Sequence, residues 1–141
     1  MNKIKIFEKK FYLLDESYNA NPHSMRLAIN HFNNIDKKMT QKILVLGDML
    51  ELGKKTKFFH RNLGKYINNS NIDKVFVIGK SILETYKFLK KNKKGKILNT
   101  MSDIGSLIRN YINDNDYVMI KGSNLTGLNN FSKKLKKGKI N

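Results

Sequence analysis

Short apolar runs that alternate with helix-like stretches constrain the fold of this chain most strongly. The runs Lys42–Leu46, Val75–Ile78 and Tyr117–Ile120 contain mostly apolar residues, as expected of strands buried on both faces of a sheet. Strands that alternate with helices imply βαβ units, in which helices cover both faces of a mostly parallel sheet. The pattern therefore predicts an α/β fold, and 141 residues are enough for one domain.

The helix-like stretches carry apolar residues at helical spacing and recognisable start signals. Asn21 followed by Pro22 is typical of an N-cap and a first helical position. Ser102 is the expected cap of a later helix that ends near Ile112. The other helices are predicted from about Thr56 to Asn69, from Ser81 to Lys91 and from about Thr126 to Lys136.

Weaker signals complete the predicted sheet and the chain end. Ile4–Phe7 and Phe11–Leu14 predict two strands joined by a tight turn at Glu8–Lys10, which makes an N-terminal β-hairpin. Lys96–Leu98 is short, as expected of an edge strand. The tail Lys133–Asn141 is expected to fray.

The composition is strongly basic, with a formal net charge of +17. A basic protein can bind nucleic acid or an acidic membrane surface. Here, however, the cations are 25 lysines and only 3 arginines, and 19 asparagines and 15 isoleucines accompany them. This bias is typical of AT-rich codon usage, and arginine, whose planar fork reads phosphate and guanine, is scarce. Specific nucleic-acid binding is therefore not expected.

No segment of the sequence indicates a membrane or an oxidising compartment. No apolar run reaches the length of about 18 residues that a bilayer requires, and the N-terminus lacks the apolar core of a secretory signal. Cysteine is absent, which excludes disulfides and thiolate metal sites. We therefore expect a cytoplasmic protein.

Polar loops follow four of the predicted strands. They are Asp15–Pro22, Gly47–Gly53, Gly79–Ser81 and Lys121–Asn124. Because the carboxyl ends of parallel strands lie at one edge of a sheet, we expect these loops to converge where α/β proteins bind ligands. A free-standing basic α/β module that binds a nucleotide or nucleic acid without catalysis could use the same edge.

None of these loops is a complete phosphate-binding or catalytic motif. The stretch from Gly47 to Lys54 resembles a Walker loop, but it is one residue too long, and Lys55 replaces the magnesium-binding Ser or Thr. No serine lies in a nucleophile elbow, and the three histidines lack metal-ligand spacing. Neither a catalytic residue nor a metal ligand is predicted.

Several polar residues of these segments have two interpretations. Asp48 and Glu51 could hold magnesium or orient a substrate amine, or Asp48 could satisfy turn amides while Glu51 faces solvent. Lys121 and Ser123 could meet a carboxylate or phosphate, or form an ordinary turn before a helix. His60 could be a buried histidine with satisfied hydrogen bonds or an anchor for a loop. The residues alone leave these alternatives open.

Four segments match a known family in order and spacing. They are Asp15–Met25 (DESYNANPHSM), Leu46–Gly53 (LGDMLELG), His60 with Gly64, and Val118–Ser123 (VMIKGS). Together they resemble the C-terminal domain of the Mur ligases, and the first two are specific to the branch that adds D-alanyl-D-alanine. The resemblance covers nearly the whole chain.

The resemblance implies a Rossmann-like domain of a three-domain enzyme. In the family, an N-terminal domain binds the UDP-sugar and a central domain carries the phosphate loop that holds most of ATP and magnesium. The C-terminal domain closes over ATP and helps to seat the dipeptide. The whole enzyme couples ATP hydrolysis to amide formation between UDP-N-acetylmuramoyl-tripeptide and D-alanyl-D-alanine. The resemblance assigns residues 1–141 to the third domain, with the other two outside this sequence, and implies that the third domain alone is inactive.

The resemblance also transfers roles to the first polar loop. Asp15, Asn19 and Asn21 match the turn that approaches the nucleotide in the family. They are the expected nucleotide-binding residues of this chain.

Other roles transfer to the second and fourth loops. Asp48 matches the loop at the interdomain cleft, and Lys121 and Ser123 match the strand end near the incoming amino-acid substrate. The resemblance gives His60 no defined role. The sequence departs from the family at Asn124, where Arg is frequent, so no carboxylate clamp is assigned there.

Overall fold

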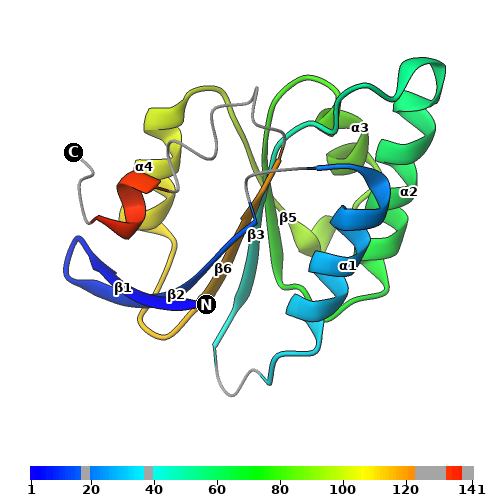
Figure 1. Cartoon of the computed structure of the whole chain (residues 1–141). Coiled ribbons are helices and arrows are strands. Elements are labelled where there is room, and N and C mark those ends of the chain that lie inside the picture. Colours follow the sequence, from blue (N-terminus) through cyan, green and yellow to red (C-terminus); the bar gives the residue numbers. More distant parts are fainter. Residues whose placement is uncertain (17–19, 37–39, 123–132, 138–141) are drawn as a thin grey trace.

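One six-stranded sheet organises the part of the chain that the structure describes (Figure 1). The structure is a computed structural model and describes residues 1–16, 20–36, 40–122 and 133–137. The first two strands pair antiparallel, and all other pairings are parallel. In sheet order, the strands are β1 (Asn2–Ile6), β2 (Lys9–Asp15), β6 (Tyr117–Lys121), β3 (Lys42–Leu46), β4 (Lys74–Ile78) and β5 (Lys94–Leu98). The predicted mostly parallel sheet with an N-terminal hairpin is confirmed.

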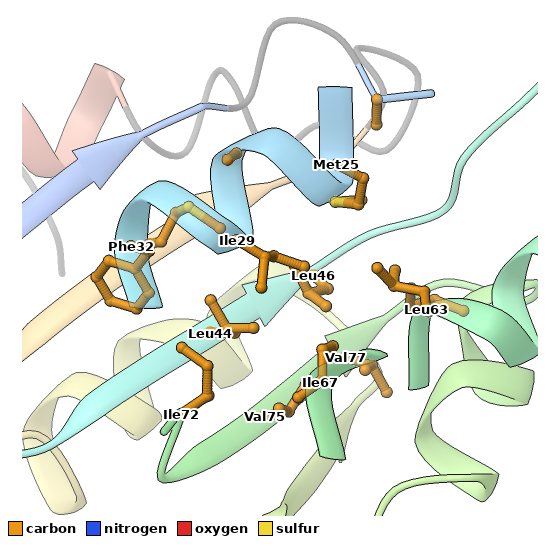
Figure 2. Packing of buried hydrophobic residues seen from close by; sticks show 14 of the residues in the cluster. Met25, Ile29, Phe32, Leu44, Leu46, Leu63, Ile67, Ile72, Val75 and Val77 are labelled. Carbon is orange, nitrogen blue, oxygen red and sulfur yellow. The ribbon is translucent and has the colours of Figure 1, made fainter. Parts of the chain in front are cut away.

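Helices cover both faces of the sheet, as predicted (Figure 1). One face carries α1 (Pro22–Asn33), α2 (Thr56–Asn68) and α3 (Ile82–Lys87), and the other carries α4 (Met101–Asn110). Figure 2 shows the apolar faces of α1 and α2 packed against the central strands. The side chains labelled there are Met25, Ile29, Phe32, Leu44, Leu46, Leu63, Ile67, Ile72, Val75 and Val77.

The central strand β3 is buried on both faces, which explains its unbroken apolar run. Ile43 and Val45 pack in the cluster on the α4 side, whereas Leu44 and Leu46 pack in the cluster on the α1 side. Successive side chains of a strand point to opposite faces, so a central strand with both faces covered has no polar side.

The start of α1 follows the expected capping chemistry. Asn21 is the N-cap: its Oδ1 accepts the Ser24 backbone N–H at 2.9 Å, and its own N–H donates to Ser24 Oγ at 3.1 Å. Pro22 occupies the first helical position, where its missing N–H costs nothing. This reciprocal cap satisfies a backbone donor on each side of the helix start and so fixes where α1 begins.

The hairpin turn and the start of α4 differ from the sequence prediction. Phe7 and Glu8 alone join β1 to β2, because both adopt positive φ and so close a two-residue turn. The fourth helix begins after Thr100, so Ser102 is not its cap. The Asp103 carboxylate accepts the backbone N–H groups of Asn99 at 2.8 Å and of Thr100 at 3.1 Å. These bonds lower the pKa of Asp103 and fix the helix start.

The third helix is shorter than predicted because α2 supplies partners for the backbone beyond its end. The Nδ2 group of Asn68 donates to the Phe88 carbonyl at 2.8 Å, and Asn68 Oδ1 accepts the Lys90 N–H at 2.7 Å. These two side-chain bonds satisfy backbone groups beyond Lys87 without a further helical turn. A short 3₁₀ turn, Lys91–Lys93, then leads into β5.

The expected fraying of the C-terminal tail is wrong for the residues that the structure describes there. Residues 133–136 are helical, and Leu135 is only 1% exposed, packed in the cluster on the α4 side. Lys136 Nζ also lies 2.9 Å from Asp15 Oδ2. Most of the predicted last helix and the end of the tail, residues 123–132 and 138–141, lie outside the described residues.

Candidate functional site

The last strand, β6, is inserted between β2 and β3, and this brings three polar strand ends side by side. The Glu16 N–H donates to the Ile120 carbonyl at 2.9 Å, and the Gly47 N–H donates to the Lys121 carbonyl at 2.8 Å. Backbone hydrogen bonds therefore join the carboxyl ends of β2, β6 and β3. The expected convergence of the loops is confirmed for their described parts.

Lys121 lies at the centre of this edge and is buried rather than solvated. Lys121 is the last residue of β6 and is only 3% exposed. Its Nζ donates to the Glu16 backbone carbonyl at 3.3 Å. Burial lowers the pKa of Lys121, and the negative charge of Glu16 opposes that shift. The lysine is therefore a buried strand residue that carries a cationic group at the carboxyl edge of the sheet, and it is not an exposed turn residue.

Asp15 and Lys121 lie on opposite faces of the sheet. Asp15 follows Leu13 by two positions on β2 and so shares its face, the α4 side. Lys121 directly follows Ile120, which also faces the α4 side, so it points to the α1 side. The Asp15 carboxylate is 2% exposed and is held by Lys136 of the C-terminal turn. The structure thus gives Asp15 an ion-pairing role beneath the edge.

Asp48 anchors the start of α3. Its Oδ1 accepts the Ile82 N–H at 2.8 Å, and its Oδ2 accepts the Lys80 N–H at 3.2 Å. The turn between β4 and α3 passes so close that a Cβ on Gly79 would lie 2.8 Å from Asp48 Cγ, and Gly79 has a φ of +138°. The interpretation in which Asp48 satisfies turn amides is the one the geometry supports. The neighbouring Glu51 is exposed and has a φ of +62°.

His60 is both a buried histidine with satisfied hydrogen bonds and an anchor for a loop. It is fully buried on α2, its Nε2 accepts the Met49 N–H at 3.1 Å, and its Nδ1 lies 2.7 Å from the Thr56 carbonyl. Both bonds form at once only when the ring is neutral and carries its proton on Nδ1. The ring therefore links α2 to the loop from Gly47 to Gly53.

The remaining predicted site residues contribute less to the described geometry. Asn21 is exposed at the N-terminus of α1, with Oδ1 engaged in the cap. Asn19 and Ser123 lie outside the described residues. The structure thus brings Glu16, Lys121 and the Gly47 end of the second loop together, with Asp48 one residue further along that loop.

A hollow of about 440 Å³ lies beside this edge, between the N-terminal parts of α1 and α2. The hollow could not be predicted from the sequence, because its walls come from segments far apart in the chain. The available signal was Phe58, an aromatic residue outside the apolar stripe of α2, and in the structure it is 57% exposed. The hollow is lined by Pro22, His23, Arg26, Met49, Phe58, Phe59, Asn62 and Leu63.

The described residues contain neither a metal-binding cluster nor a membrane-spanning helix. No three His, Asp or Glu side chains in the described ranges gather closely enough to hold a metal ion. None of the helices described is long and apolar enough to cross a membrane.

Comparison with known proteins assigns the chain to a family. Residues 4–124 match the family described as "Mur ligase, glutamate ligase domain". The UDP-N-acetylmuramoyl-tripeptide–D-alanyl-D-alanine ligase of Buchnera aphidicola subsp. Baizongia pistaciae is 39% identical over 112 residues, which cover 70% of this chain and 24% of the relative. The ligase of the same name from Bacillus subtilis is 43% identical over 68 residues, which cover 48% of this chain and 15% of that protein.

Solved structures share the fold. The chain is similar to MurF ligase from Thermotoga maritima in complex with ADP, with a TM-score of 0.74, 22% identity and coverage of 97% of this chain and 30% of that one. It is also similar to MurF from Acinetobacter baumannii, with a TM-score of 0.73, 24% identity and coverage of 96% and 29%. The chain spans about a quarter of the length of the first curated relatives. By its family match and its fold, this chain belongs to the Mur ligase C-terminal domain family.

Proposed function

We propose that the chain is the C-terminal domain of an ATP-dependent ligase that adds D-alanyl-D-alanine to UDP-N-acetylmuramoyl-tripeptide in peptidoglycan synthesis. In this proposal the domain closes over ATP and helps to seat the dipeptide, and it works in the cytoplasm with an N-terminal and a central domain as its partners. The curated relatives that carry this name support the assignment. The domain alone is inactive, because phosphoryl transfer requires a phosphate cradle that this sequence lacks.

The observation that carries the proposal is the meeting of β2, β6 and β3 at one edge. The segments of this chain that resemble the family's substrate-facing segments follow these three strands. An α/β sheet binds ligands at the carboxyl ends of its strands. A dipeptide carboxylate would find there the buried ammonium group of Lys121, a charge-assisted partner. Ser123 would add a hydroxyl, and Asp48 would line the cleft while it holds the start of α3.

The residues of this chain fit a minor role in nucleotide binding. Asn21 uses Oδ1 for the helix cap, which leaves its amide N–H₂ group to donate to a nucleotide oxygen at an exposed helix N-terminus. The Asp15 carboxylate already pairs with Lys136, so we propose that it acts mainly by fixing the end of β2, ahead of the predicted nucleotide-binding residues Asn19 and Asn21. ATP, when bound, supplies the phosphoryl group that activates the tripeptide carboxylate.

Magnesium does not fit the described residues. Asp15 and Asp48 are engaged with Lys136 and with the α3 amides, and no metal-binding cluster occurs in the described ranges. We therefore assign magnesium to none of the described residues of this chain.

A domain replacement tests the proposal. This chain takes the place of the C-terminal domain in the Bacillus subtilis relative, and phosphate release from ATP is followed with UDP-N-acetylmuramoyl-tripeptide and D-alanyl-D-alanine. The chimera should turn over only when the dipeptide is present, whereas the 141-residue chain alone should release no phosphate. Turnover by the chain alone, or a folded chimera without dipeptide-dependent turnover, would contradict the proposal.

A further inference from the structure

Hydrogen bonds connect α2, the loop from Gly47 to Gly53 and α3 in a closed circuit. From α2, the His60 ring accepts the Met49 N–H of the loop at 3.1 Å. From α3, Thr85 Oγ1 donates to the His60 backbone carbonyl at 2.7 Å. His60 and Thr85 are both fully buried, so water does not compete for these bonds.

Asp48 closes the circuit. It directly precedes Met49, and its carboxylate accepts the N–H groups of Lys80 and Ile82 at the start of α3. The hydrogen bond that holds Met49 is therefore connected, through Asp48, to the turn before α3. The loop is held from both sides, by an imidazole on one side and by a helix start on the other.

The helices approach so closely that the circuit has little room to relax. A Cβ on Gly64 would lie 2.6 Å from the Thr85 carbonyl oxygen and 3.2 Å from Phe88 Cβ. Gly64 lies one helical turn after His60, so the same face of α2 presents the ring and the close contact. His60 and Gly64 thus both lie on the face of α2 that contacts α3, where His60 bonds Thr85 and Gly64 allows the close approach.

We propose that His60 is a positioning residue for the ligase reaction. Its neutral ring fixes the backbone of Met49 and thereby the loop that follows β3 at the ligand-binding edge. His60 lies beneath that edge and acts through the loop. This inference rests on the proposed function and adds a role for His60, to which the resemblance gives no defined role.

Histidine suits this position because it offers an acceptor to Met49 and a donor to Thr56 from one compact ring. A phenylalanine would fill similar space but would leave the Met49 N–H without its partner. A glutamine has both an acceptor and a donor on its amide and can replace the first bond. His60→Phe and His60→Gln therefore separate hydrogen bonding from burial. Ile67→Ala, in the same helix and fully buried, is the control for a loss of stability alone.

The first measurement uses the 141-residue chain. Nitrogen-15 NMR of the imidazole should show the proton on Nδ1 of His60, and the Met49 amide should be protected from hydrogen exchange. In His60→Phe, exchange at Met49, Lys80 and Ile82 should rise at least tenfold, while His60→Gln should restore most of the protection. Equal protection in His60→Phe and in the unchanged chain would overturn the circuit.

The second measurement uses the chimeric ligase, at a temperature where all variants are folded. His60→Phe should lower kcat or raise the KM for D-alanyl-D-alanine about tenfold or more, His60→Gln should recover most of the activity, and Ile67→Ala should stay within about twofold of the unchanged chimera. Activity of His60→Phe within twofold, or an equal loss in Ile67→Ala, would overturn the positioning role. An inactive unchanged chimera would overturn the proposed function, and with it this role, whatever the exchange data show.

Discussion

Gly79 offers the sharpest test of how Asp48 holds the start of α3. The residue has a φ of +138°, a conformation that side-chain-bearing residues rarely adopt. A Cβ there would also overlap Asp48 Oδ1 and lie 2.8 Å from Asp48 Cγ. Gly79→Ala should therefore strain the backbone and displace the carboxylate from the Lys80 and Ile82 amides.

The expected cost follows from these two effects. Backbone strain in a disallowed region contributes about 1–3 kcal/mol. Loss of hydrogen bonds to a charged carboxylate adds about 1.5–3 kcal/mol. Gly79→Ala should thus lower the free energy of unfolding by about 2.5–6 kcal/mol, which for a domain of this size is a fall in Tm of roughly 8 °C or more. Gly53→Ala is the matched control, because Gly53 has a φ of +58° but no atom within 4 Å of an added Cβ. Its cost should be only about 1–2 kcal/mol.

Urea denaturation of the two variants measures this difference, and a double-mutant cycle identifies its cause. In an Asp48→Ala background the overlap disappears, so the cost of Gly79→Ala should fall to that of backbone strain alone. The reasoning is refuted if Gly79→Ala costs no more than Gly53→Ala, or if its cost is the same with and without the Asp48 carboxylate.

Three further predictions concern packing on the α4 side of the sheet, stability in acid and the net charge. Leu135→Ala should lower the free energy of unfolding by about 2–4 kcal/mol, because Leu135 is only 1% exposed. A melting temperature within 2 °C of that of the unchanged chain, which corresponds to roughly 0.5 kcal/mol, would contradict the packing of Leu135. The Asn99 and Thr100 amides lower the pKa of Asp103 in the folded state, so its stabilising effect is complete above the unfolded value and lost as pH falls through the folded value. The stability difference between the unchanged chain and Asp103→Asn should therefore shrink below about pH 4, and a difference that is constant from pH 7 to pH 3 would refute this. DNA binding driven by the +17 charge should be weak, blind to sequence and steeply reduced by salt, whereas a nanomolar complex at 200 mM salt, on the order of the affinity of a specific site, would support a nucleic-acid function.

Local signals in the sequence sufficed for the elements with strong physical determinants. The unbroken apolar run of β3 predicted a strand with both faces covered, and the pair Asn21–Pro22 predicted the start of α1. In both cases the information lies within a few adjacent residues. The end of α3 could not be predicted in this way, because Asn68 of another helix satisfies backbone groups just beyond it.

The site depended on contacts that are distant in sequence. The insertion of β6 between β2 and β3 follows from packing of the whole sheet, and it is this order that buries Lys121 at the edge. A lysine in a sequence is expected to be exposed, so its burial could not be foreseen. The ion pair between Asp15 and Lys136 likewise joins the two ends of the chain. The motifs therefore predicted which segments converge, and the structure adds which face each side chain takes.

Steady-state kinetics of Lys121→Met in the chimeric ligase test the central claim, that the edge formed by β2, β6 and β3 faces the dipeptide. Methionine retains the buried apolar stem of Lys121 but removes its charge. Lys93→Met is the matched control, because Lys93 is also buried. Its ammonium group donates to the Ser70 and Ile72 carbonyls, which precede β4 and so lie at the opposite edge of the sheet. The account predicts that Lys121→Met raises the KM for D-alanyl-D-alanine or lowers kcat by about 10- to 100-fold, as expected for a lost charge-assisted contact, with the KM for ATP within about twofold. Lys93→Met should leave all three constants within about twofold of the unchanged chimera. Full activity and unchanged dipeptide KM in Lys121→Met would contradict the claim.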